Sequence, residues 1–222
     1  MKRILVFVIV LLMPLLASAE VTWTGGVGAG QMIVLDGIKQ SSTEKQIASI
    51  PGVMSSESIE DKTTYKSFSL GRCWNENFCV EGAYLWGAHF GTNLAINNVG
   101  VGVVNVGGSQ IDFGTLPANL TMRREADVSA AQLSALWKVP VSDYVDVFGR
   151  VGLYDYNVKT TAKILLPGTS IFLAEESEDR GTVPMASIGF DANFLKKLTI
   201  RVEGQKTGVV SIFSVLFVYK IK

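Results

Sequence analysis

The only two cysteines in this sequence, Cys73 and Cys79, are the residues whose spacing points most directly to chemistry. They flank residues 74–78, WNENF, in which the central Asn-Glu-Asn is typical of a tight turn. In an antiparallel hairpin centred on this turn, the two cysteines lie opposite each other with Cα atoms roughly 4.5–5.5 Å apart. A disulfide can bridge such a distance. We therefore interpret the pair as a structural disulfide at the end of one hairpin.

Two other roles for the cysteines stay open. They can remain unpaired, or they can belong to a redox or metal site, which the spacing disfavours. The pair lacks the C-x-x-C spacing of thiol redox motifs. A zinc site needs further ligands, and the chain holds a single histidine, His89. We predict no metal site and no cofactor.

Charged residues inside otherwise apolar segments form the second candidate set. They are Glu81, Arg150, Arg201 and Glu203. Burying such charges is costly unless they are paired, so their role depends on whether the fold brings them together. An enzyme would need a base beside a nucleophile, and no fixed spacing marks one around His89. We predict no catalytic residues, and we predict that the protein is not an enzyme.

The first residues predict export. Lys2 and Arg3 precede an apolar run over residues 4–16, and Ala17-Ser18-Ala19 follows. This pattern is typical of a secretory signal peptide, and the run is shorter than the roughly 20 residues that a spanning helix needs. We expect a signal peptide over residues 1–19, cleaved after Ala19, and one domain over residues 20–222. Disulfides persist in the periplasm.

Composition narrows the class further. Without Lys2 and Arg3 the chain has 18 basic and 20 acidic residues, so its net charge is −2. That balance gives no indication of nucleic-acid binding. The mean hydropathy of +0.30 is high and fits either a soluble secreted domain or a surface that faces lipid.

Alternation separates these two classes. In residues 78–90 the even positions carry Phe78, Val80, Tyr84 and Trp86, and this period of two predicts a strand. Similar segments recur along the chain. The predicted strands are residues 22–33, 65–73, 78–90, 127–139, 145–158, 182–194, 198–205 and 209–222. An even number of strands with no helical pattern between them predicts an all-β fold: an eight-stranded antiparallel transmembrane β-barrel with up-and-down meander topology.

The connections between the predicted strands alternate in length. Short turns are expected at residues 74–77, 140–144 and 195–197. Long loops are expected at residues 34–64, 91–126 and 159–181. Outer-membrane barrels have short turns in the periplasm and longer loops outside the cell, so this pattern indicates the bacterial outer membrane.

Three stretches of the sequence resemble the family of small outer-membrane barrels that includes the OmpA transmembrane domain and the OmpX–Ail group. They are GRCWNENFCVEGAYLWG, LSALWKVPVSDYVDVFGRVGLYDY and the final SVLFVYKIK. The last is similar to the terminal strand that the outer-membrane insertion machinery recognises. The family usually ends in Phe, whereas this chain has Ile221 followed by Lys222.

The strand assignments place the charged residues in the lumen. Alternate residues of a strand face opposite sides, so odd or even position along the strand (its parity) decides which residues face the lumen. By parity the interior holds Glu81, Arg150, Arg201 and Glu203, together with Lys138, Asp191 and Lys220. His89 also faces the lumen, near the outer end of its strand. Eight strands leave a lumen that side chains can fill. The resemblance implies an acidic–basic cluster at this depth, which Glu81 and Arg150 match. The cluster is either a plug or an ion-pair gate over a narrow water path.

These expectations lead to a hypothesis about function. The long loops would give the protein a structural or surface-interaction role, and the resemblance implies adhesion or another host contact. The alternative is a small-conductance channel gated by the lumen ion pairs. Expected partners are outer-membrane lipid, lipopolysaccharide, the insertion machinery and a host surface ligand. We expect a monomer.

Overall fold

The computed structural model describes residues 21–34, 54–59, 62–74, 77–97, 103–106, 109–112, 119–165 and 172–221. The predicted signal peptide and much of the first predicted loop, residues 34–64, lie outside the described residues. Within them no helix is long and apolar enough to cross a membrane.

The described residues form strands almost throughout. Their bounds are β1 Val21–Val34, β2 Met54–Ile59, β3 Lys62–Trp74, β4 Phe78–Asn97, β5 Val103–Val106, β6 Ser109–Asp112, β7 Asn119–Ser142, β8 Val145–Leu165, β9 Phe172–Leu195, β10 Leu198–Thr207 and β11 Val210–Ile221.

The main sheet closes on itself. Nine strands follow the order β2-β4-β3-β1-β11-β10-β9-β8-β7, and a further pairing of β4 with β7 joins the ends. β2 and β3 both pair with the same side of β4. β3 pairs with residues 78–86 of β4, and β2 pairs with residues 92–97. Eight strands therefore close the barrel, each antiparallel to its neighbours in sequence, and the predicted fold class is confirmed.

Several strands are longer than predicted. β4 continues to Asn97, β7 begins at Asn119, β8 continues to Leu165 and β9 begins at Phe172. The prediction of loops over residues 91–126 and 159–181 is therefore wrong for most of their length. These extensions carry polar side chains where the membrane segments carry apolar ones, as in the Glu-Glu-Ser-Glu-Asp-Arg run of β9. Apolar alternation is the main strand signal in a sequence, and here it is missing.

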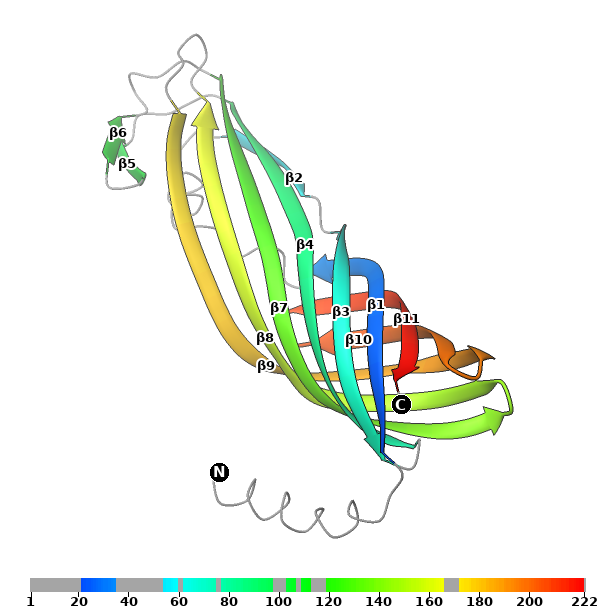
Figure 1. Ribbon diagram of the computed structural model, residues 1–222. Helices are drawn as coiled ribbons and strands as arrows, with labels where there is room; N and C mark the ends of the chain where they lie inside the picture. Colours follow the sequence, from blue (N-terminus) through cyan, green and yellow to red (C-terminus); the bar gives the residue numbers. More distant parts are fainter. Residues whose placement is uncertain are drawn as a thin grey trace, which may run out of the picture.

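The extensions form a second region, the protruding sheet. It consists of residues 88–97 of β4, 119–128 of β7, 158–165 of β8 and 172–179 of β9, with β2 along its edge. Figure 1 shows these strands running on as one curved sheet past the ends of β1, β3, β10 and β11.

The outer face of the barrel carries an apolar band. Along β7 the outward-facing residues from Val141 to Ala131 include Trp137 and Leu133, both more than half exposed. The ten residue-to-residue steps from Val141 to Ala131, at about 3.3 Å each and tilted by about 40°, give a height of roughly 25 Å. This is the height of the lipid-facing band of outer-membrane barrels. Further along β7, Asp127 marks the change to a polar face.

One β-bulge reverses the parity of β4. The register against β7 shifts between Leu85 and Ala88, and Gly87 has φ of 78°, a conformation that favours glycine. Beyond the bulge the even residues face inward, so Phe90 is fully buried. His89 consequently lies on the outer face. The prediction that His89 faces the lumen is wrong, because simple alternation cannot register an inserted residue.

The interior is layered. One apolar cluster, on the extracellular side, includes Met32, Leu85, Phe90, Tyr154 and Met185. A smaller cluster near the short turns contains Cys73, Cys79, Leu136 and Phe148. Glu81 and Arg150 lie between the two clusters: Glu81 stands between Cys79 and Leu85 on β4, and Arg150 stands between Phe148 and Tyr154 on β8.

Candidate functional site

Six charged residues meet inside the barrel and form what we call the lumen network. They are Glu81 on β4, Lys138 on β7, Arg150 on β8, Asp191 on β9, and Arg201 and Glu203 on β10. Every one of them occupies an inward-facing position of a regular strand. Five neighbouring strands thus supply the network. Because the barrel is closed, β4 and β10, at the two ends of this group of strands, face each other across the lumen.

One half of the network joins three residues near the short turns. Lys138 Nζ lies 2.5 Å from Asp191 Oδ2. Arg201 lies directly opposite Asp191 in the register of β9 and β10, and it donates to both carboxylate oxygens, with Nε to Oδ1 at 2.8 Å and Nη2 to Oδ2 at 3.1 Å. This bidentate geometry fixes the plane of the guanidinium.

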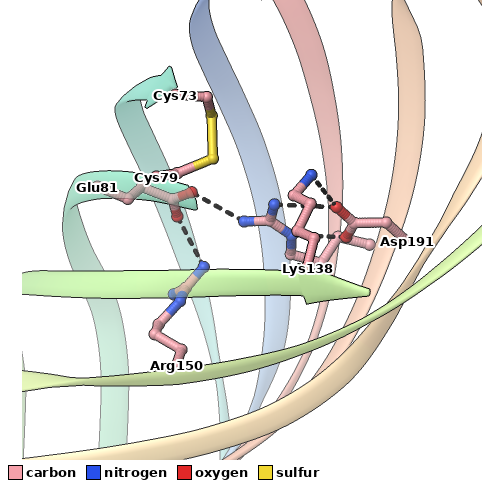
Figure 2. The surroundings of a disulfide bond; sticks show 7 residues. Cys73, Cys79, Glu81, Lys138, Arg150 and Asp191 are labelled. Atoms are coloured by element: carbon pink, nitrogen blue, oxygen red, sulfur yellow. Dashed lines mark hydrogen bonds and ion pairs between the residues drawn. A yellow bond between two sulfur atoms is a disulfide. The ribbon is translucent and has the colours of Figure 1, made fainter. Parts of the chain in front are cut away.

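The other half is built around Glu81, as Figure 2 shows for its contact with Arg150. Glu81 Oε1 accepts from Arg150 Nη2 at 2.8 Å, and Oε2 accepts from Arg201 Nη1 at 2.8 Å. Arg150 Nη1 in turn lies 3.3 Å from Glu203 Oε1. The six charges therefore alternate in sign along one continuous path from Lys138 to Glu203.

Burial explains why the charges are paired. The side chains of Glu81, Arg150, Arg201 and Glu203 are at most 3% exposed. Removing an ion from water costs several kcal/mol, which only close partners of opposite sign can offset. With three acidic and three basic residues the network is neutral.

The end of the network at Glu203 is its loosest part. Glu203 Oε1 accepts no hydrogen bond, and Arg150 Nε has no hydrogen-bond partner, among the described residues. A cavity of about 20 Å³ lies beside them, lined by polar residues that include Tyr65, Ser67 and Gln205. A polar cavity of this size has room for one water molecule.

The disulfide lies directly on the turn side of Glu81. Cys73 and Cys79 are bonded, with Cα atoms 4.0 Å apart, and both are buried. They stand opposite each other in the β3–β4 register, as do Trp74 and Phe78. The predicted disulfide is confirmed. Figure 2 shows Glu81 two residues further along β4.

The structure brings together all four residues that the sequence singled out for the lumen, and also Lys138 and Asp191. Lys220 is on the inward face but half-buried near the end of β11. His89 lies apart, on the outer face, where its Nδ1 is 2.9 Å from Asp127 Oδ1 and both side chains are exposed.

Two features of the interior were not predicted from the sequence. Gln132 donates a hydrogen bond to Gln205 at 3.1 Å across the lumen. Both residues stand at inward-facing positions of their strands, so the alternation of the sequence could have placed them in the lumen. The apolar cluster around Phe90 and Tyr154 depends on the bulge in β4, which no sequence signal indicated. Within the described part of the chain, no group of three or more His, Cys, Asp or Glu side chains is placed to hold a metal ion.

Comparison with known proteins gives a family match and fold-level similarities. The profile of the OmpA-like transmembrane domain matches residues 18–211. No curated protein matches the chain in sequence.

Several solved structures are similar to this chain. Ail, the attachment invasion locus protein of Yersinia pestis, in complex with the heparin analogue sucrose octasulfate, is 12% identical with a TM-score of 0.45, over 91% of this chain and 99% of that chain. The outer membrane protein OprG from Pseudomonas aeruginosa is also 12% identical at a TM-score of 0.45, over 91% and 98%. The N-terminal barrel domain of OprF from the same organism is 7% identical at 0.45, over 90% and 97%.

Proposed function

Because this chain belongs to the family of OmpA-like transmembrane domains and forms a bacterial outer-membrane β-barrel, we propose that it acts through the surface that it presents outside the membrane. Its role is structural and interactive, with the protruding sheet as the part that contacts partners. The observation that carries this proposal is the open edge of that sheet along β9.

The pairing of β9 defines the edge. On one side β9 pairs with β8 from Phe172 to Ala192. On the other side it pairs with β10 only from Met185 onward. Residues 172–184 therefore have one side without a strand partner among the described residues. The β5–β6 hairpin lies beside β9 (Figure 1), but its two strands pair with each other. An unpaired edge can accept an added strand from another chain.

The chemistry of this edge selects its partner. Glu176, Glu178, Asp179 and Arg180 are all exposed, which makes the edge acidic overall. Arg180 donates two hydrogen bonds to Glu178 Oε1, and these contacts lower the pKa of the Glu178 carboxyl, which keeps it charged. Like charges disfavour pairing between two copies, whereas a basic extended segment of a host surface protein would be attracted.

Lipopolysaccharide is a second expected partner, on the outer face of the same sheet. Arg123, Lys159 and Lys163 lie there, with Lys159 nearest the apolar band. Arg123 and Lys163 each also contact the carboxylate of Glu125. Such cations suit the phosphate groups of the outer leaflet.

The test measures adhesion of bacteria that display the protein to cultured epithelial cells. The variant Glu176→Gln/Glu178→Gln/Asp179→Asn removes the acidic charge of the edge while leaving its backbone unchanged. We expect this variant to lose adhesion, and the control Asp143→Asn, in a short turn at the opposite end of the barrel, to keep it. Equal adhesion by both variants at equal surface amounts would contradict the proposal.

The alternative function is a small-conductance channel gated by the lumen network. The polar cavity beside Arg150 and Glu203 favours it, because water there would form the start of a path. The apolar cluster on the extracellular side opposes it, since Phe90, Tyr154 and Met32 are at most 1% exposed. An ion would have to pass this cluster as well as the network, so we rank the channel second.

A further inference from the structure

Arg72 occupies an unusual position on the outer face of the barrel. Its guanidinium lies 5.7 Å from the centre of the Trp23 ring and 5.2 Å from the centre of the Trp74 ring. Trp23 stands directly opposite Arg72 in the β1–β3 register, and Trp74 is two residues further along β3. A cation is thus held between two indoles, next to the exposed apolar side chains of Leu70 and Val80.

Arg72 differs from the buried cations in the groups that it contacts. Lys138, Arg150 and Arg201 each contact a carboxylate inside the barrel. Arg72 is exposed, and among the described residues its guanidinium lies against the two rings. An arginine facing lipid is costly near the membrane centre and nearly neutral at the interface, so its depth decides what it can contact.

The depth follows from the strands. Arg72 is two residues from the end of β3, and Trp23 is two residues from the start of β1. Both ends lie at the side of the barrel with the short turns, which is the periplasmic side. The ring of Phe78 stacks on that of Trp74 with centroids 5.8 Å apart and lies tilted against that of Trp137 at 4.9 Å, which extends the row of aromatic rings around the barrel. Arg72 therefore lies at the level of the lipid head groups in the periplasmic leaflet.

We propose that Trp23, Arg72 and Trp74 form a binding site for the phosphate group of a glycerophospholipid in the periplasmic leaflet. The guanidinium offers parallel N–H donors that match two phosphate oxygens. The two rings restrict the arginine side chain, so less conformational freedom is lost on binding. Each indole N–H is a further donor at an interface where tryptophan is favoured.

The assay is native mass spectrometry of the protein extracted from outer membranes, delipidated in detergent and mixed with one lipid at a time. The lipids are palmitoyl-oleoyl-phosphatidylglycerol and palmitoyl-oleoyl-glycerol, which has the same acyl chains without the phosphate. We expect the native protein to retain the first lipid and not the second. Equal retention of both lipids would overturn the proposal, because the acyl chains alone would then account for binding.

Two variants test the role of Arg72. We expect Arg72→Gln to lower the affinity for phosphatidylglycerol by about tenfold or more, since it removes a charge-assisted bidentate contact. Arg72→Lys keeps the charge without the fork and should show an intermediate loss. The matched control is Lys197→Gln, which removes an exposed cation from a turn at the same end of the barrel.

Folding is checked separately by the shift in gel mobility between unheated and heated samples. If Arg72→Gln folds and retains phosphatidylglycerol as well as the native protein does, the proposal is wrong. If Lys197→Gln loses as much lipid as Arg72→Gln, binding depends on total positive charge and the proposal is also wrong.

Discussion

Glu81 is central to the lumen network because it contacts two arginines, one with each carboxylate oxygen. Its neighbours in the network each depend on it for charge compensation in a space that excludes bulk water. The other two acidic residues are less central. Asp191 contacts Lys138 and Arg201, and Glu203 lies at the end of the path and contacts Arg150.

The first prediction follows from this position. Replacing Glu81 with Gln should lower the free energy of unfolding by about 3–5 kcal/mol, because breaking a buried pair leaves charges uncompensated. Urea unfolding in detergent micelles, read from the mobility of the folded band on gels, measures the change. The control Glu178→Gln removes an exposed carboxylate with an arginine partner and should leave the midpoint unchanged. An equal midpoint for Glu81→Gln and the native protein would contradict the account.

At the residue scale, parity along each strand was enough to place the lumen residues. Arg201 and Asp191 illustrate this: both stand inward in β9 and β10, and the register sets them opposite each other. Parity could not give the distances or decide which arginine Glu81 contacts. It failed for His89, because the bulge at Gly87 lies between that residue and the rest of the predicted strand.

At the scale of single elements, the bulge in β4 determines which residues fill the extracellular half of the lumen. Without the extra residue, His89 would point inward and Phe90 outward, and the apolar cluster could not form. The bulge depends on Gly87, which alone among the described glycines has a positive φ.

The second prediction concerns this glycine. Gly87→Ala should cost about 1–2 kcal/mol of stability, since an L-residue is disfavoured in the left-handed region. Gly149→Ala is the matched control: a Cβ would meet nothing within 4 Å at either position, and only Gly87 has the unusual φ. The same urea titration compares the two variants. Equal losses would show that the backbone conformation at Gly87 carries no cost.

The third prediction concerns the β3–β4 hairpin. The variant Cys73→Ser/Cys79→Ser should fold and lose about 2 kcal/mol, the amount that the chain-entropy model gives for so short a loop. In the native protein, maleimide labelling under denaturing conditions should be negligible until a reductant is added. Strong labelling without reductant would show that the two thiols are free.

The number of barrel strands and their short turns could be predicted, because each membrane-spanning segment alternates apolar and polar residues between recognisable turns. The extensions of β7, β8 and β9 could not. Both faces of the protruding sheet lie outside the lipid, so residues such as Glu125, Lys159 and Glu178 replace the apolar positions that mark a strand. There the hydrogen bonds of neighbouring strands define the structure, and these do not show in a sequence.

At the scale of the whole molecule, two regions with different surroundings share the same four long strands. The barrel below carries an apolar outer face and a filled interior, and the sheet above carries charged residues on its outer face. Among the described residues, β9 lacks a second strand partner over 172–184 because β10 ends at Thr207 while β9 extends back to Phe172.

The fourth prediction tests the membrane assignment. The protein should fractionate with the outer membrane and migrate faster on a gel when unheated than after boiling, because the closed sheet resists detergent until it is heated. Amino-terminal sequencing of the same material should begin at Glu20 if the signal peptide is cleaved after Ala19. A protein found in the periplasm without a mobility shift would contradict the assignment.

The most direct test of the account is planar-bilayer conductance of the native protein beside Glu81→Ala and Arg150→Ala. Folding of each protein is verified by the gel-mobility shift of the protein in the lipid vesicles that are fused to the planar bilayer. We expect that none of the three conducts, because the apolar cluster around Phe90 and Tyr154 closes the lumen independently of the network. Steady conductance that changes in either variant would contradict it, and would identify the lumen network as the gate of a channel.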